Sequence, residues 1–351
     1  MTVLISGNRL LADRSHPRSN SNRYAWQRAW LMITLQICIA AVVWCGWTSA
    51  SQAAWPERPI RLIVPVAAGG GVDLMARILA DRLSQQLPQR VLIENLGGGG
   101  GSIAARAVAN AEPDGYTLLF ATPGIAALPA THQPPPFDPI ADFSPVSLVT
   151  EFPLVAIIRP EIPAQTFPDF VTLLKANPQK YNYGSSGVGS SSHMPVELFR
   201  FMAGVEMQHV PFRGNALATT ALLGGQIDFV IDGLSPQLGN IADRRVRVLG
   251  VTTLTRTPFL PDAPAIAEFL PGYQYPMWVA LFAPAKTPAS IVNALADEVS
   301  KAVCEPSTRK RYQDIQASPI GSKPAELGEY FRRQLNFNAD IARRANIRLS
   351  N

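Results

Sequence analysis

Side chains capable of nucleophilic catalysis gather in one short stretch in the second half of the chain. Residues 184–193 read Gly-Ser-Ser-Gly-Val-Gly-Ser-Ser-Ser-His, and His209 and Asp232 follow. One of these serines, a histidine and the aspartate could serve as the nucleophile, base and acid of a serine hydrolase. However, Val188 stands where the G-x-S-x-G nucleophile motif has its last glycine. Serines in such a loop more commonly donate hydrogen bonds or cap a helix, so the hydrolase is the alternative interpretation.

A second glycine-rich turn lies near the start of the mature sequence. Residues 60–64, Ile-Arg-Leu-Ile-Val, predict a strand, and apolar residues between 74 and 83 recur with the spacing of a helix. Gly69, Gly70 and Gly71 lie between the two. The turn matches neither G-x-G-x-x-G nor a phosphate-binding loop that ends in Lys and Ser or Thr. A nucleotide site is therefore not indicated here.

The two turns share a physical property. Each directs backbone N–H groups and the positive end of a helix toward one place, and the second adds serine hydroxyls. If each belonged to a separate lobe, together they would form a clamp for a carboxylate without any catalytic groups. The alternative is that both are ordinary turns between a strand and a helix.

The first 53 residues have the pattern of a secretory signal peptide. Five arginines precede an apolar run over residues 31–47, and small residues follow at 48–54. Ser51-Gln52-Ala53 is the expected cleavage triplet, and an uncleaved membrane anchor is the alternative. This segment holds five arginines and one acid, Asp13, so the net charge of +5 falls to about +1 in the mature chain. The basic pI therefore does not indicate nucleic-acid binding.

The inventory of cysteines and histidines argues against a disulfide, a metal site or a cofactor. Cys304 is the one cysteine outside the signal peptide, so no disulfide can form within the mature chain. We expect its thiol to be buried or half-buried in a helix over residues 291–303. The four histidines and the cysteines show neither His-x-x-x-His nor Cys-x-x-Cys spacing, so we expect no metal.

Strands and helices alternate along the mature chain, which predicts an α/β fold with parallel sheets covered by helices. Two similar apolar strands, at 154–158 and 278–283, flank the middle segment. We infer that the chain crosses twice between two lobes with a ligand cleft between them. The expected organisation is a signal peptide at 1–53, lobe 1 at 54–154, lobe 2 at 155–279, and the mostly helical remainder of lobe 1 at 280–351.

Several motifs, in order along the mature chain, resemble the Bug family, the extracytoplasmic solute receptors (TctC) of tripartite tricarboxylate transporters. The matching stretches are residues 55–65 and 68–73, Glu94-Asn95, 113–118, 142–146, 183–193, 209–214, 223–226 and 260–264. The resemblance covers nearly all of the mature chain. It implies a type II periplasmic binding protein, with two α/β lobes that close on a small carboxylated solute.

Transferred residue by residue, the resemblance implies that the turns hold a carboxylate, partly through ordered water. The ligand-binding residues that it implies are Ala68, Gly70, Val72, Asp73, Thr122, Ser186, Gly189, Ser190, His193 and Asp232. Of these, Asp73 is better suited to capping its helix, because its charge would repel an anion.

This chain departs from the family pattern at two places. Val72 stands where the family usually has Thr or Ser, and Leu96-Gly97 stands where it usually has Arg-Pro. The first departure removes a hydroxyl and indicates a less polar ligand than the usual dicarboxylate.

The resemblance implies a periplasmic receptor rather than an enzyme. We expect ligand-driven closure about hinges near residues 154–158 and 278–283. The closed form would be recognised by the membrane subunits of a transporter or, alternatively, by a sensor protein. We expect a monomer without a cofactor.

Overall fold

The computed structural model describes residues 30, 32, 36, 55–275 and 277–347, together with the backbone of 349 and 350. The chain divides into two units, Met1–Ala54 and Trp55–Asn351, and the fold described here is that of the second. The expected signal peptide lies almost entirely outside the described residues. Within the described part, no helix is both long and apolar enough to cross a membrane.

A six-stranded sheet forms the first lobe, with strand order β12-β5-β11-β3-β1-β2. The strands are β1 (Ile60–Val64), β2 (Val91–Asn95), β3 (Thr117–Ala121), β5 (Phe143–Phe152), β11 (Met277–Pro284) and β12 (Ser318–Pro319). β1 pairs in parallel with β2 and β3, whereas β11 is antiparallel to β3 and β5. The predicted parallel pairing is confirmed for β1, β2 and β3, whereas the pairings of β5, β11 and β12 are antiparallel, so the sheet as a whole is mixed.

Helices cover both faces of this sheet. One face packs against α2 (Gly71–Gln86), α9 (Ala289–Cys304) and α10 (Pro306–Asp314). The other packs against α3 (Ser102–Ala109), α4 (Gly124–Thr131) and α11 (Pro324–Arg344), and a short 3-10 turn, η1 (Gly99–Gly101), precedes α3. A two-stranded ladder of β4 (His132–Gln133) and β13 (Leu349–Ser350) follows α4.

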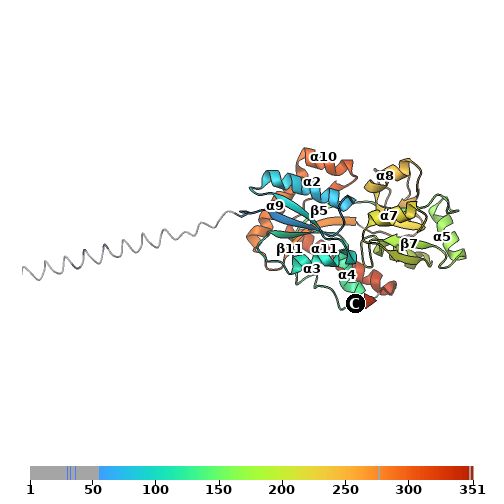
Figure 1. Cartoon of the computed structure of the whole chain (residues 1–351), viewed down its shortest axis with the longest axis horizontal. Helices are drawn as coiled ribbons and strands as arrows, with labels where there is room; N and C mark the ends of the chain where they lie inside the picture. Colours follow the sequence, from blue (N-terminus) through green and yellow to red (C-terminus); the bar gives the residue numbers. More distant parts are fainter. Residues whose placement is uncertain are drawn as a thin grey trace, which may run out of the picture. The chain divides into compact units, whose positions relative to one another are not determined.

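A five-stranded sheet forms the second lobe, with strand order β10-β6-β9-β7-β8. Its strands are β6 (Leu154–Ile158), β7 (Asn182–Ser185), β8 (Gln208–Pro211), β9 (Phe229–Gly233) and β10 (Arg247–Val251). Its helices are α5 (Phe167–Ala176), α6 (Met194–Ala203), α7 (Asn215–Leu223) and α8 (Leu234–Ala242), and η2 (Ile266–Glu268) is a 3-10 turn. Figure 1 shows α5, α7, α8 and β7 together at one end of this unit and α2, α3, α9 and α10 at the other.

The two sheets repeat one arrangement. Three parallel strands, β3, β1 and β2 in one lobe and β9, β7 and β8 in the other, adjoin one antiparallel strand. That strand is β11 in the first lobe and β6 in the second. Since parallel strands end at the same edge, each lobe gathers three turns at its carboxyl edge.

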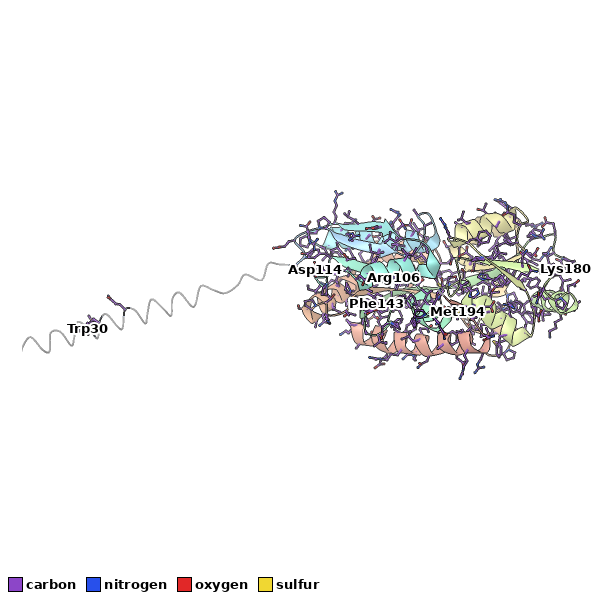
Figure 2. The ribbon with its side chains drawn as sticks, turned by 60° about the horizontal axis from the view of Figure 1, so that its bottom comes forward. Trp30, Arg106, Asp114, Phe143, Lys180 and Met194 are labelled. Carbon is purple, nitrogen blue, oxygen red and sulfur yellow. The ribbon has the colours of Figure 1, made fainter. Side chains whose placement is uncertain are left out.

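The helix α11 contacts both lobes. Leu327 and Phe331 belong to the core beneath the first sheet, whereas Ile341 and Ala342 belong to the core of the second lobe. In Figure 2 this long helix runs along the bottom of the molecule, and Met194 at the start of α6 lies close above it. One continuous helix therefore ties the two lobes together on this side.

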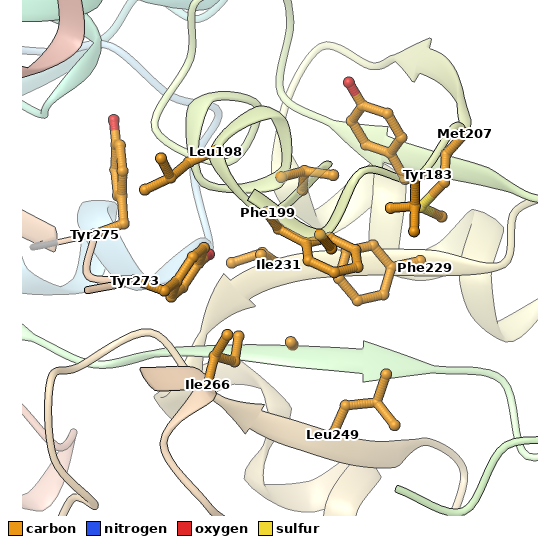
Figure 3. Close-up of a cluster of buried hydrophobic side chains, with 14 of the residues drawn as sticks. Tyr183, Leu198, Phe199, Met207, Phe229, Ile231, Leu249, Ile266, Tyr273 and Tyr275 are labelled. Atoms are coloured by element: carbon orange, nitrogen blue, oxygen red, sulfur yellow. The ribbon is translucent and has the colours of Figure 1, made fainter. Parts of the chain in front are cut away.

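The core of the second lobe is built on stacked aromatic rings (Figure 3). The ring of Phe199 lies 6.4 Å from that of Phe170 and 5.8 Å from that of Phe229. Phe170 comes from α5, whose start is fixed by a capping box of Thr166 and Asp169. These rings fix α5 and α6 against β9.

The thiol of Cys304 is exposed, so the prediction that it would be buried was wrong. Cys304 is the last residue of α9, and the buried side of that helix end is formed by Val299, Ala302 and Val303.

Replacing a ring of the aromatic core tests this packing. We expect Phe199→Ala to lower the free energy of unfolding by about 3–5 kcal/mol, because Phe199 is fully buried. Phe201 lies on the same helix and is 45% exposed, so Phe201→Ala is the matched control, with an expected loss below about 0.5 kcal/mol. Urea denaturation gives both values, and equal losses would contradict the assigned core.

Candidate functional site

The carboxyl ends of all six parallel strands surround one region between the lobes. The turns after β1, β2 and β3 contribute Gly70, Gly100 and Thr122, and those after β7 and β8 contribute Ser186 and Gly214. The turn after β9 contributes the start of α8. Ligands of open α/β sheets bind at such edges.

A cavity of about 80 Å³ lies in this region, and residues of both lobes form its walls. The first lobe supplies Val66, Ala67, Gly70, Gly71, Val72, Met75, Phe152 and Met277. The second supplies Leu154, Ser186, Ser191, Gly214, Asn215, Ala216, Asp232, Gly233, Ser235 and Pro236. A smaller hollow of about 20 Å³ shares Val66, Ser186, Ser191 and Gly214 with it and adds Thr122, Ser190 and Arg213. The two hollows are therefore adjacent parts of one site.

Three helices begin at the cavity with a glycine as their N-cap, namely α2 at Gly70, α7 at Gly214 and α8 at Gly233. A glycine has no side chain to accept from the first-turn N–H groups, which leaves them for a ligand or water. At α8, however, Gly233 N–H donates to Asp232 and Leu234 N–H donates to the Pro153 carbonyl. Among the described residues, the helix starts at the cavity without such partners are therefore those of α2 and α7, and at α8 the N–H group of Ser235 is left.

The carboxylate of Asp73 holds the first turn in place. It accepts hydrogen bonds from Gly69 N–H at 2.9 Å, from the Arg77 guanidinium and from Asn95 Nδ2 at 2.9 Å. Burial by itself would raise the pKa of Asp73, but the bonds from Arg77, Gly69 and Asn95 hold that pKa below its usual range. Asp73 thus fixes the turn after β1 to the end of β2 and does not line the cavity.

The carboxylate of Asp232 is fully occupied within the second lobe. It accepts from Asn215 Nδ2, Gln237 Nε2, Gly233 N–H and Thr219 Oγ1. Burial raises the pKa of Asp232, although these four donors act against the shift. A carboxylate has about four acceptor positions, so Asp232 fixes the starts of α7 and α8.

The serine-rich loop, residues 185–193, is folded on itself. The Ser186 hydroxyl lies 3.0 Å from that of Ser192, and His193 Nδ1 accepts from Gly189 N–H at 3.3 Å. The other histidine, His209, places Nε2 2.6 Å from the Ser185 hydroxyl. Ser185 and His209 are thus a serine and a histidine in contact, but Ser185 is fully buried and within the described residues neither histidine is bonded to Asp232, so the arrangement of a serine hydrolase is not formed.

The two lobes meet backbone to backbone beside the cavity. A Cβ on Gly100 would lie 2.7 Å from the Val188 carbonyl oxygen, and one on Gly187 would lie 3.1 Å from Gly100 N. Nearby, a Cβ on Gly189 would lie 2.5 Å from the hydroxyl of Thr131. Glycine at these positions therefore allows the two loops to approach each other more closely than residues with a Cβ would.

The structure brings six of the ten predicted site residues to the two hollows. Gly70, Val72, Ser186 and Asp232 line the larger, and Thr122, Ser190 and Ser186 line the smaller. The remaining four line neither hollow: Ala68 is exposed, Asp73 and His193 are buried, and Gly189 packs against Thr131.

Arg213 is a site residue that was not predicted. It lines the smaller hollow and makes no ion pair with any residue that the structure describes. Its signal in the sequence is Arg213-Gly214 between a strand and a helix, the same strand–turn–helix pattern as at the other two turns. Among the described residues, no group of three His, Cys, Asp or Glu could hold a metal.

Two α/β lobes with a cavity at their facing carboxyl edges define a periplasmic binding protein. The family model for the tripartite tricarboxylate transporter family receptor, TctC, matches residues 75–347. The chain belongs to this family of solute-binding receptors, which are not enzymes.

Individual relatives agree with this assignment. The UPF0065 protein in the tcbD–tcbE intergenic region of Pseudomonas sp. (strain P51) is 37% identical over 304 residues, 84% of this chain and 89% of the relative. The solved periplasmic binding protein BugD has a TM-score of 0.80 at 30% identity, covering 84% of this chain and all of BugD.

Two solved relatives hold carboxylates. An R. palustris protein with adipate has a TM-score of 0.80 at 34% identity, over 84% of this chain and all of its own. MatC from Rhodopseudomonas palustris, with bound malate, has a TM-score of 0.76 at 31% identity, over 82% and 99%.

A matched pair of glycine substitutions tests the contact between the lobes. Gly100 and Gly204 have φ of +65° and +61°, so alanine at either costs about 1–2 kcal/mol of backbone strain. A Cβ on Gly204 meets no atom within 4 Å, whereas one on Gly100 meets Val188. We expect Gly100→Ala to lower the free energy of unfolding, measured by urea denaturation, by about 1–3 kcal/mol more than Gly204→Ala does. Equal losses for the two variants would contradict a tight contact.

The buried His193 and the half-buried His209 make stability depend on pH. Burial, the largest cause, lowers the pKa of both His193 and His209 to about 3; Arg200 adds to the shift at His193, and charged neighbours modify it at His209. The unfolded chain, with a histidine pKa of about 6.5, then binds more protons between pH 6.5 and 3, so stability falls as the pH decreases through that range. Tyr183, Glu197 and Arg200 face this pair.

Removing one titrating ring should weaken the pH dependence. Between pH 7.5 and pH 5.5, we expect the free energy of unfolding of His209→Phe to fall by about 1.4 kcal/mol less than that of the wild type. The reason is that one histidine fewer is protonated on unfolding. Urea denaturation at both pH values provides the comparison, with Tyr273→Phe as a control in the same core that leaves the histidines in place. An unchanged pH dependence would show that His209 is not the titrating group.

Proposed function

We propose that this chain is an exported solute receptor that captures a small carboxylated metabolite by lobe closure. It then delivers the metabolite to the membrane subunits of a tripartite tricarboxylate-type transporter. The observation that carries the proposal is the cavity between the lobes, where the uncapped starts of α2 and α7 face Ser186 and Ser191. The adipate and malate bound by two relatives support a carboxylate as the ligand.

In this proposal the ligand carboxylate lies where the two hollows join. Ser186, Ser191 and Gly214 line both hollows, and Arg213 lines the smaller one. Hydroxyls, N–H groups and one guanidinium would share the charge, with Gly70, Val72 and Thr122 bordering the ligand. Asp73, Asp232 and His193 would act by holding the turns.

Closure follows from contacts with both lobes. A solute that touches the first lobe at Gly70 and the second at Ser186 is bound fully in the closed form alone, so it shifts the population toward that form. The segments between β5 and β6 and before β11 cross between the sheets and would act as hinges. The closed surface is then what the membrane partner recognises, and a sensor protein is the alternative partner.

The experiment for this proposal is thermal unfolding of the exported protein against monocarboxylates, dicarboxylates, aromatic acids and amino acids. A ligand at a hundred times its Kd adds about 2.7 kcal/mol to stability and raises Tm. A rise with one class of acid identifies the ligand chemistry. No rise with any acid would contradict the receptor proposal.

Arg213 provides a prediction for the acid that gives the rise. We expect Arg213→Gln to raise its Kd about tenfold or more, because a charge-assisted hydrogen bond to the carboxylate is lost. Arg309→Gln is the control, since Arg309 is an exposed arginine on α10, which does not border the cavity. Isothermal titration gives both values. Equal affinity of the Arg213→Gln variant and the wild type would remove Arg213 from the site.

A further inference from the structure

The larger cavity has a polar end and an apolar end. The residues that it shares with the two neighbouring hollows identify each end. Ser186, Ser191 and Gly214 also line the smaller hollow that contains Arg213. Phe152 and Met277 instead also line a third hollow, of about 330 Å³, on the crossing segments. Ser186 and Ser191 therefore lie at the side toward Arg213, and Phe152 and Met277 lie at the side toward the crossing segments.

The apolar end offers no positively charged partner for a second carboxylate. Phe152 and Met277 stand there, and no Lys, Arg or His lines the larger cavity in the part of the chain that the structure describes. Asp232 is the charged group in its wall, and its acceptor positions are filled by its own lobe. A carboxylate buried at this end would lose its hydration without gaining a positive charge beside it, which is costly.

The start of α8 supplies neutral donors but no positive charge. Two of its first N–H groups are bonded to Asp232 and to the Pro153 carbonyl, and Pro236 has no N–H, so Ser235 is the residue of this turn that brings a hydroxyl and an N–H group to the cavity. Among the described residues that line the two hollows, Arg213 is the one positively charged side chain, and it lies at the polar end. One end of the site therefore offers a positive charge to an anionic group, and the other end does not.

The size of the cavity sets the scale of the ligand. At about 80 Å³ the cavity is smaller than the roughly 150 Å³ cavity that holds a benzene molecule, so it favours one carboxylate with a short body.

We propose that the ligand is a monocarboxylate with an apolar body, and that Phe152 and Met277 determine this specificity. The proposal rests on the proposed receptor function and narrows its ligand class. The ligand carboxylate faces Ser186 and Arg213, and its body packs on the two apolar side chains. The receptor therefore prefers acids with one charge, unlike the two relatives solved with dicarboxylates.

Acids of equal length that differ by one terminal carboxylate provide the test. Isothermal titration of the exported protein compares hexanoate with adipate, butanoate with succinate, and benzoate with terephthalate. We expect the monocarboxylate to bind about tenfold or more tightly in each pair that binds. A dicarboxylate that binds equally or more tightly overturns this inference and leaves the receptor function intact. No binding in any pair overturns the inference and also counts against the function.

Variants at the apolar end test whether Phe152 and Met277 cause the preference for a monocarboxylate. Phe152 is partly buried, and Phe152→Gln places an amide donor at this end of the cavity. We expect it to reduce the ratio of the two affinities at least threefold, whereas Phe201→Gln, an exposed phenylalanine of α6, leaves the ratio unchanged. Met277→Gln, which preserves side-chain length, is a second variant if the first does not fold. An unchanged ratio in a folded variant removes that residue from the specificity determinant.

Discussion

The close approach of two backbones, at Gly100 in the first lobe and residues 187–190 in the second, is the constraint on which the site depends. The gap leaves no room for a Cβ at Gly100 or Gly187. Because the serine-rich loop is pressed against the glycine run, Ser186 and Ser191 face the start of α2 across the cavity. A wider gap would separate the groups that surround one carboxylate, so the density of glycines is a requirement of the interface.

Each lobe uses one buried carboxylate to hold its part of the cavity wall. Asp73 accepts from the turn before α2, and Asp232 accepts from the starts of α7 and α8. Such acids would repel an anionic ligand if they faced it unpaired, but here their acceptor positions are filled by the chain itself. The negative charges thus orient the neutral N–H groups of the turns, and under the proposed function this explains why acidic residues lie close to a carboxylate site.

Most of the fold could be predicted because its strands are apolar and bounded by turn residues. β1 and β6 match their predicted ranges, residues 60–64 and 154–158. β5 was missed because Pro145 and several polar residues interrupt its ten-residue pattern, although much of it is buried. α8 was missed because Pro236 and Gly239 have low helix propensity, although the helix starts directly after β9. Intrinsic helix and strand propensities predict the structure least well where tertiary contacts determine it.

The site could be predicted only as far as its turns. Glycine and serine runs indicate where the backbone is exposed to a ligand, but distances between lobes depend on the packing of the whole chain. The sequence therefore predicts Gly70, Ser186 and Thr122 near the ligand, yet it cannot show that Ala68 faces outward or that Arg213 reaches the same hollow.

The apolar end of the cavity connects ligand choice to movement of the lobes. Phe152 ends β5 and Met277 begins β11, next to the segments that cross between the two sheets. Phe152 also packs on the cores of both lobes. A ligand body that lies on these side chains contacts the segments that must bend on closure, so its shape affects the closed form more than the open one. In this fold, the residues that select the apolar body are then also the residues through which binding favours closure.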